Sequence, residues 1–548
     1  MNQLLSIALL VGLMVLVVRM RCRRTARIAL FVGFAGILLI SRLQSIFFPL
    51  ELNPDESHLL ALGLRMMHSP IPWVGFDGTT SGPMNVFLAG LAWGLPLESS
   101  YSSLRILAFL SVLATSVVYF CAASKLLGFT RAVFVTMPLA FFYAITRQAD
   151  FVHFSSEVLP NLLISIQVLI ISIIVSGLPT TRRVGHLLFF AGFIPALVFF
   201  AKLQAVPAAA VCFLTTFAVL WCSSVPKAFF VKGAGWAALG GCVGVVMILG
   251  PVVIAGGLGE FYVRYIEFAL HHKSPTLGFH PVTHMRDLFW SGWEGFTACL
   301  AALTGLLVAV GLPVLRKRNL CHVSIVLVAG SVLNLAVVIY SIIKTQQVFP
   351  HYINLLIPAV QWRVICAFFF LDKNGYSRRT FQLNSFVAIN IVVFLALTWV
   401  YPGRISPRMD SSRAFRASDE IVNAIKASNR PLAVWGWAPH YYVLSGLAPA
   451  GRDTILHTVL TKSSRQEAYL RALAADWREA RPEFILDSVA ENNQTICPEW
   501  GSDLEGLRAA NSPYIQDILR ESYELVGTYG AATSKQPQRL YRLKKTVD

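Results

Sequence analysis

The stretch Asn53-Pro54-Asp55-Glu56-Ser57-His58 decides how the rest of this chain is interpreted. It follows an apolar segment, residues 28–48, that is long enough to cross a membrane. Two adjacent carboxylates so close to the hydrocarbon are costly unless they face water, a metal ion or a reacting group. Asp55 and Glu56 are therefore candidate catalytic residues. The alternative is a solvated helix start without chemistry, because aspartate is a good helix cap.

The residues after the acidic pair predict a helix. Leu59, Leu60, Gly63 and Met66 recur at helical spacing. We expect Asp55 to cap this helix and the helix to lie on the membrane surface. The loop that contains it, residues 49–103 (the first loop), is too long for a simple connection. It continues through a turn-rich stretch at 73–83 into a second short apolar helix at 84–95.

The composition identifies the class of protein. Hydrophobic residues make up 55% of the 548 residues and charged residues only 14%, whereas about 25% of the residues of a soluble domain are charged. The formal net charge of +17 does not indicate nucleic-acid binding, because the basic residues fall in short clusters between apolar spans, as membrane topology requires. The chain is predicted to be a polytopic membrane protein.

Apolar stretches predict about twelve transmembrane helices, followed by a polar C-terminal region. We expect a membrane domain over residues 1–401 and a separate domain over residues 402–548. The predicted spans are residues 3–18, 28–48, 104–123, 132–146, 158–177, 187–201, 206–222, 234–255, 296–314, 323–343, 351–370 and 381–401.

Basic residues in alternate loops predict the orientation. One set of loops holds Arg19, Arg21, Arg23, Arg24, Arg27, Lys125, Arg131, Arg182, Arg183, Lys227, Lys232, Arg316, Lys317, Arg318, Lys373, Arg378 and Arg379. The other set, although longer, holds only Arg65, Arg147, Lys202, Arg264, Lys273, Arg286 and Lys344. The positive-inside rule places the first set in the cytoplasm. The first loop, the loop at 147–157 (the second loop), the loop at 256–294 (the third loop) and the C-terminal region are then extracytoplasmic, or periplasmic for an inner-membrane protein.

The C-terminal region has the pattern of a small α/β domain. Short apolar runs at 432–437, 483–486, 524–528 and 539–543 predict strands. Residues 467–480 predict a helix with one apolar face. No glycine-rich nucleotide-binding pattern opens a helix here, so we do not expect catalysis in this region.

The motifs together resemble those of the GT-C glycosyltransferases that use polyprenyl-phosphate sugars, relatives of protein O-mannosyltransferases and lipid A aminoarabinose transferases. Five segments carry the resemblance, in the family's order: Asp55-Glu56, Ser155-Ser156-Glu157-Val158-Leu159-Pro160, Ala201-Lys202-Leu203-Gln204, Phe349-Pro350-His351-Tyr352, and Val434-Trp435-Gly436-Trp437-Ala438-Pro439 with Ser445-Gly446. The chain departs from the aminoarabinose transferases at His58, where they have Arg. It also lacks, at Ser81-Gly82-Pro83, their Lys before a Pro-Pro pair.

The resemblance implies transfer of a sugar from a polyprenyl-phosphate donor to a glycolipid, polysaccharide or protein of the cell envelope. Asp55 would act as general base with Glu56 in support, with inversion at the anomeric carbon. The implied substrate-binding residues are His58, Arg147, Glu157, Lys202, Gln204, His351 and Tyr352. These residue types suit the chemistry, because a carboxylate in a partly desolvated site accepts a proton and a cation stabilises a leaving phosphate.

Each residue also has a simpler interpretation. Glu157 is placed where a helix dipole favours a carboxylate, Lys202 can reach to the membrane interface, and His351 and Tyr352 suit an interfacial belt. Three roles are open for Glu56: it orients a hydroxyl, it binds a divalent metal, or it only faces solvent. Four histidines in the third loop are too irregularly spaced to predict a metal site.

Two other classes of function compete with the enzyme. Twelve spans suit a secondary transporter, but the chain has no internal repeat and its ionisable groups cluster at one end of the spans. A non-catalytic protein of envelope assembly would have no use for an acidic pair at the membrane edge.

Overall fold

The structure is a computed structural model that describes residues 3–20, 22–97, 100–177, 181–223, 226–271, 281–310, 321–345, 348–374, 379–400, 419–460, 464–489, 506–529 and 537–545. The chain forms two compact units. The helical unit comprises residues 1–46, 105–250 and 276–406, and the mixed unit comprises residues 47–104, 251–275 and 407–548. This division differs from a single boundary at residue 402, because the first loop and part of the third loop fold with the C-terminal region.

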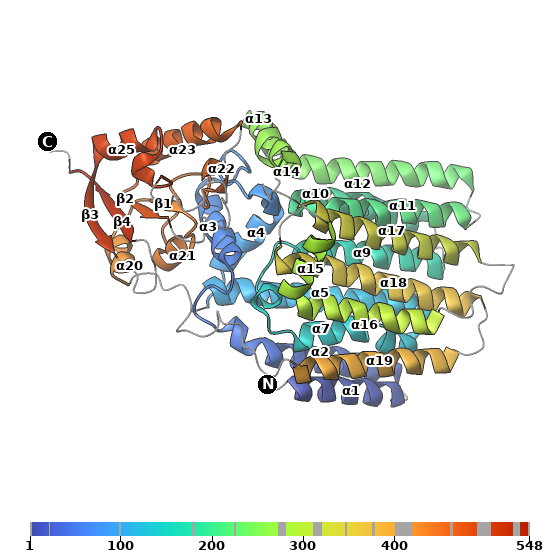
Figure 1. Ribbon diagram of the computed structural model, residues 1–548. Helices are drawn as coiled ribbons and strands as arrows, with labels where there is room; N and C mark the ends of the chain where they lie inside the picture. The colour runs from blue at the N-terminus through green and yellow to red at the C-terminus, as the bar shows by residue number, and fades with distance from the viewer. Residues whose placement is uncertain are drawn as a thin grey trace. The chain divides into compact units, whose positions relative to one another are not determined.

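The long helices of the helical unit run side by side (Figure 1). Among the described residues, eight helices are long and apolar enough to cross a membrane. α18 is the most buried of these, because side chains all round it are covered by its neighbours. The long helices are α1 (Gln3–Arg19), α2 (Arg23–Ile46), α5 (Ser100–Leu127), α9 (Val158–Ser176), α10 (Thr181–Ala201), α11 (Val206–Cys222), α12 (Lys227–Ile254), α16 (Trp293–Val310), α17 (His322–Lys344), α18 (Ile353–Lys373) and α19 (Arg379–Val400).

The prediction of one helix over residues 132–146 is wrong in detail. Two short helices, α6 (Phe129–Val135) and α7 (Met137–Ile145), replace it. Pro138 explains the break, because proline has no N–H to bond back into the preceding turn and is accepted only at a helix start. The shorter elements of this unit are α8 (Ala149–Val152), η2 (Leu203–Ala205), α15 (Pro281–Ser291) and η5 (Pro350–Tyr352).

The mixed unit is built on a four-stranded sheet of order β1-β2-β4-β3. β1 (Leu432–Gly436) pairs parallel with β2 (Phe484–Ser488), and β4 (Gln538–Leu543) pairs antiparallel with both β2 and β3 (Tyr523–Tyr529). All four predicted strands and the predicted helix, α23 (Gln466–Ala480), are confirmed to within two residues. The unit also contains α3 (Pro54–His68), η1 (Thr79–Ser81), α4 (Gly82–Trp93), α13 (Leu258–Phe261), η3 (Tyr262–Glu267, a π-helix), α14 (Phe268–His271), α20 (Asp419–Lys426), α21 (His440–Ser445), α22 (His457–Leu460), η7 (Ala509–Asn511) and α25 (Ile515–Ser522).

Both faces of the sheet are covered. Trp435 and Ile485 face α23 and α25, in a cluster that includes Leu473 and Trp477. Val434 and Leu486 alternate to the opposite face, as the two-residue period of a strand requires. That second cluster includes residues of α20 and α21 and also Ala61 of α3. The helix that carries Asp55 is therefore part of the core of the mixed unit.

Candidate functional site

Asn53 caps the helix that carries the acidic pair. Its backbone is extended (φ −147°), and its side-chain oxygen accepts a hydrogen bond from the N–H of Asp55 at 3.0 Å. Pro54 then occupies the first helical position, where its missing N–H has no cost. The prediction that Asp55 is the cap is wrong. Asp55 is the second residue of α3 and is half-buried, so its carboxylate is not needed to begin the helix.

Glu56 differs from Asp55 in its surroundings. Its side chain is completely buried, with 0% exposed, and one carboxylate oxygen accepts a hydrogen bond from the N–H of Leu52 at 2.9 Å. The next residue, Ser57, donates to Glu51 at 2.6 Å and contacts the hydroxyl of Tyr101 at 2.6 Å. Glu56 does not face solvent. Its hydrogen bond to Leu52 holds the loop before the helix in place. A role of Glu56 in support of Asp55 stays a prediction.

α3 does not have the one-sided burial of a surface helix. Leu59, Leu60, Leu62 and Leu64 point in different directions around the helix, and all are buried. Gly63 lies against α4 so closely that an added Cβ would lie 2.6 Å from the backbone nitrogen of Gly90. The expectation of an amphipathic helix on the membrane surface is therefore wrong. Too many of its positions are apolar for one face, and the other protein elements of this unit cover them.

His58 lies one helical turn after Asp55 and contacts the C-terminal region. Its Nδ1 is 2.6 Å from the hydroxyl of Thr454, and only 3% of the residue is exposed. Burial lowers the pKa of His58 to about 4, against the opposing influence of the carboxylates of Asp55 and Asp77. The imidazole is therefore neutral at neutral pH. Because His58 is buried, a substrate can touch it only if the surrounding residues move.

The neighbour of Thr454, Asp453, belongs to a buried ion cluster. Arg264 Nη1 lies 3.2 Å from both carboxylate oxygens of Asp453 and 3.1 Å from Oδ2 of Asp77. The Nε of Arg264 donates to Glu260 at 2.6 Å. Burial raises the pKa of Asp453 to about 6, since Arg264 offsets it only in part and the nearby Asp77 adds to it. One guanidinium thus joins the first loop, the third loop and the C-terminal region.

Four other predicted residues meet in the helical unit. The ammonium of Lys202 forms an ion pair with Glu157 and donates to Ser156 at 2.6 Å, and Lys202 is only 4% exposed. Lys202 is therefore a paired cation, and its ammonium does not reach out to the membrane interface. Tyr352 presents its ring to Lys202, with 5.2 Å between the ammonium and the ring centre. Burial acts to raise the pKa of Glu157, but Lys202 and His351 outweigh it, so that the pKa is lowered.

His351 completes this group. Its Nδ1 lies 3.5 Å from Asp150, and its ring packs edge-on against His153 and Tyr352 and stacks on Phe349. The resulting Glu157–Lys202 cluster, consisting of Asp150, His153, Ser156, Glu157, Lys202, His351 and Tyr352, brings together three of the segments that carry the family resemblance.

Gln204 and Arg147 have other contacts. Gln204 donates to the carbonyl of Ser341 at 3.2 Å, which ties η2 to α17. The backbone N–H of Arg147 donates to Glu294 at 3.3 Å, and the hydroxyl of Thr146 donates to the same carboxylate. The start of the second loop is therefore held by the first turn of α16. The binding of substrate by Gln204 and Arg147 stays a prediction.

Sequence reasoning did not select several residues that organise these surroundings, among them Asp77, Asp150, Arg264, Glu294, Asp453 and Thr454. Arg264 and Glu294 are two of the seven charged residues of the third loop, and nothing in the sequence distinguishes them from the other five. Asp453 and Thr454 are not distinguished either, because their partners are 189 and 396 residues away.

The described residues hold no group of three or more His, Cys, Asp and Glu side chains with the geometry of a metal site. One carboxylate oxygen of Glu56 accepts the hydrogen bond from the N–H of Leu52. Of the third-loop histidines, His272, His280 and the side chain of His271 lie outside the described residues.

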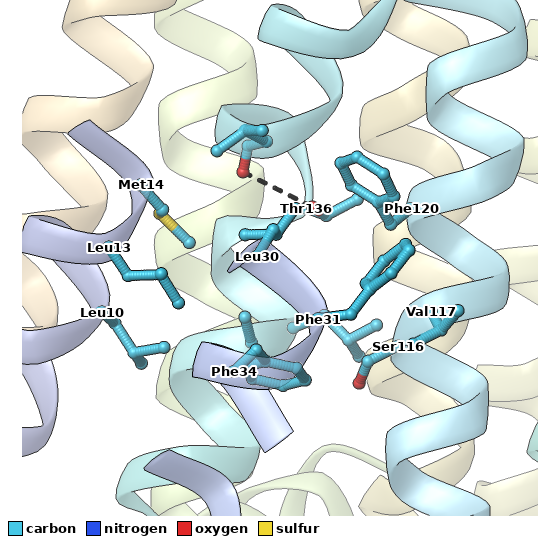
Figure 2. A pocket seen from close by; sticks show the side chains of 13 residues that line it. Leu10, Leu13, Met14, Leu30, Phe31, Phe34, Ser116, Val117, Phe120 and Thr136 are labelled. Atoms are coloured by element: carbon cyan, nitrogen blue, oxygen red, sulfur yellow. Dashed lines mark hydrogen bonds between the residues drawn. The ribbon is translucent and has the colours of Figure 1, made fainter. Parts of the chain in front are cut away.

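An apolar cavity of about 40 Å³ lies among α1, α2, α5, α6 and α7 (Figure 2). Two hydroxyls line it, but Ser116 donates to the carbonyl of Val112 at 2.9 Å and Thr136 to that of Ala132 at 2.8 Å. The other lining side chains are apolar, so the cavity offers a sugar almost no hydrogen-bond partners.

Comparison with known proteins gives a structural match over the whole chain. ArnT from Cupriavidus metallidurans in the apo state matches with a TM-score of 0.56 and 12% identity, over 95% of this chain and 98% of that chain. ArnT bound to undecaprenyl phosphate matches with a TM-score of 0.55 and 11% identity, over 94% and 98%. The Archaeoglobus fulgidus oligosaccharyltransferase in the apo form matches with a TM-score of 0.41 and 12% identity, over 95% and 74%. No protein-family model and no curated protein matches the sequence.

The chain therefore has the fold of ArnT from Cupriavidus metallidurans, which here consists of a polytopic helical unit and a mixed unit that contains the C-terminal sheet. At this level of identity the match establishes the fold alone.

Proposed function

We propose that this protein is a membrane glycosyltransferase that moves a sugar from a polyprenyl-phosphate donor to an acceptor of the cell envelope. The observation that carries the proposal is the place of Asp55. Its carboxylate is half-buried in the first turn of α3, where Asn53 has already supplied the cap, in a chain with the fold of ArnT. That ArnT binds undecaprenyl phosphate supports a lipid-phosphate donor here.

Asp55 is the general base of the proposed reaction. It accepts the proton of an acceptor hydroxyl while the oxygen attacks the anomeric carbon of the donor sugar. The bond from that carbon to the lipid phosphate breaks, and the phosphate leaves with the electron pair. The phosphate is a good leaving group, so no general acid is needed. Attack from the side opposite the phosphate inverts the configuration at the anomeric carbon.

Lys202 is the proposed ligand of the donor phosphate. An ammonium has three N–H donors, and Ser156 and Glu157 account for two of them. Among the described residues no partner takes the third N–H, which leaves it for a phosphate oxygen. Because Glu157 already neutralises Lys202, the phosphate has to share this cation with a carboxylate. We infer that Lys202 contributes a hydrogen bond and local order more than an unpaired positive charge.

The proposed orientation places Asp55 and the C-terminal region on the extracytoplasmic face of the inner membrane. The asymmetry of Lys and Arg among the short loops supports it. A phosphatase reporter that folds only outside the cytoplasm, fused after Asp548, is expected to be active. A reporter active only in the cytoplasm would reverse the topology and with it the side of the reaction.

The direct test is to incubate the purified protein in lipid vesicles with radiolabelled polyprenyl-phosphate sugars and an envelope extract. We expect label to pass from one donor to an extracted acceptor, which would identify both. A secondary transporter would move solute across the vesicle without any transfer. A protein of envelope assembly would do neither. Failure of transfer with every polyprenyl-phosphate sugar would contradict the proposed function.

A further inference from the structure

We propose that Thr454, in the C-terminal region, is a positioning residue for Asp55 and acts through His58. The inference deepens the proposed function and rests on it. The C-terminal region has no nucleotide-binding pattern, and Thr454 lies 396 positions along the chain from His58. This region nevertheless supplies one of the side chains that fix the candidate catalytic helix.

The contact between Thr454 and His58 is buried on both sides. The hydroxyl of Thr454 lies 2.6 Å from Nδ1 of His58, and the two residues are 1% and 3% exposed. His58 follows Asp55 by three positions on α3, so the two side chains lie on the same side of the helix. Fixing the His58 ring therefore fixes the turn of helix from which Asp55 projects.

Thr454 is itself held in place by the ion cluster around Arg264. Both oxygens of Asp453, the preceding residue, lie 3.2 Å from Arg264. Arg264 also binds Asp77, whose other oxygen accepts the N–H of Thr79 at 2.8 Å. The N–H of Asp77 in turn donates to the carbonyl of Arg452 at 2.9 Å. The connection between α21 and α22, which carries Thr454, is thus attached to both the first loop and the third loop.

The arrangement also keeps a positive charge away from Asp55. A protonated imidazole one turn away would stabilise the carboxylate anion and weaken it as a base. Burial keeps His58 neutral at neutral pH, and the hydroxyl of Thr454 satisfies Nδ1 without adding charge. A Thr at position 454 serves this purpose better than an acidic residue would, because an acid there would favour the imidazolium.

The test compares Thr454→Val, which keeps the shape and removes the hydroxyl, with Thr454→Ser, which keeps the hydroxyl. Thr458→Val is the matched control. Thr458 is equally buried in the same unit, and its hydroxyl has no hydrogen-bond partner among the described residues. The two readouts are hydrogen–deuterium exchange of the backbone amides at 53–58 and the kcat and KM of sugar transfer.

Thr454→Val is expected to increase amide exchange at 53–58 and to lower kcat about tenfold or more, with KM for the donor nearly unchanged. Thr454→Ser should restore both quantities, and Thr458→Val should change neither. His58→Leu removes the same hydrogen bond from the other side and should reproduce the effect, so it serves as the test should Thr454→Val fail to fold.

Wild-type exchange and wild-type kcat in both Thr454→Val and His58→Leu would overturn the inference. Equal losses in Thr454→Val and Thr454→Ser would overturn it as well, because the hydroxyl would then be irrelevant. The exchange measurement needs no substrate. Absence of transfer activity in the wild type would therefore contradict the proposed function, while the exchange data would still decide whether Thr454 orders the Asp55 turn.

Discussion

Lys202 and Glu157, 45 positions apart in the sequence, form an ion pair in which both side chains are almost completely buried. Ser156 and the ring of Tyr352 complete the surroundings of the ammonium. In such surroundings a charge without its partner is strongly unfavourable. The pair has to be treated as one element when its role is tested.

Replacement of Lys202 by Met alone is expected to lower the free energy of unfolding by about 3–5 kcal/mol, because the carboxylate of Glu157 remains buried without its cation. The double variant Lys202→Met with Glu157→Gln should recover most of that loss. Thermal unfolding in detergent measures both. If the single variant is as stable as wild type, the pair does not exist in the folded protein.

The same double variant tests the role of Lys202 in donor binding without the complication of lost stability. We expect it to bind polyprenyl phosphate about tenfold more weakly, as the loss of one charge-assisted hydrogen bond predicts. Arg286→Met is a suitable control, because Arg286 is an exposed cation paired only with its neighbour Asp287 among the contacts described for it. Equal affinity of the double variant and wild type would leave Lys202 a structural residue.

Gly63 tests whether α3 packs against α4 as the structure indicates. A Cβ at this position would lie 2.6–2.9 Å from backbone atoms of Ala89 and Gly90, which cannot move independently of their helix. Gly63→Ala is expected to destabilise the mixed unit by about 1–3 kcal/mol. Gly259→Ala, in α13, meets no atom within 4 Å and should be neutral or slightly stabilising. Similar unfolding temperatures for the two variants would refute the packing.

Much of this fold can be predicted because its signals are local. Short apolar runs predict the strands at 432–437 and 539–543, and the length and hydropathy of other segments predict the membrane spans. The helix cap illustrates where local signals become ambiguous. Asn53 and Asp55 are both good caps, and the decisive residue is Pro54, which prefers the first helical position and so assigns the cap to Asn53.

The candidate site could be predicted only in part, because its partners are distant in sequence. The acidic pair beside a predicted span identified Asp55 and the family resemblance indicated Glu157, but no pattern in one sequence pairs Lys202 with Glu157 or Arg264 with Asp453. Those pairs exist because each buried charge needs an opposite charge, and which residue supplies it depends on the folded chain.

His58 and Asp453 should give the mixed unit two opposing pH dependences. The pKa of His58 falls from 6.5 to about 4 on folding, so the stability that its neutral form contributes is present above pH 6.5 and is lost as the pH falls toward 4. The pKa of Asp453 rises from 3.8 to about 6, so its contribution is greatest at low pH and is lost as the pH rises through 6.

Variants separate these two contributions between pH 4 and pH 7. His58→Gln should lose less stability than wild type on acidification, because it no longer takes up a proton on unfolding. Asp453→Asn should lose more, because the compensating gain from Asp453 is gone. Chemical unfolding at several pH values measures the slopes. Parallel curves for wild type and both variants would show that neither group titrates with a shifted pKa.

The general base is tested most directly by Asp55→Asn. Asparagine keeps the shape of the side chain but cannot accept the proton, and the cap is unaffected because Asn53 provides it. The companion variant Glu56→Gln is expected to reduce the rate of transfer less than Asp55→Asn does. The measurement is the rate of transfer of radiolabelled sugar from polyprenyl phosphate to the envelope acceptor. For Asp55→Asn we predict a rate about a hundredfold or more below wild type, with donor affinity and unfolding temperature unchanged. Turnover equal to wild type would contradict the assignment of Asp55 as the base.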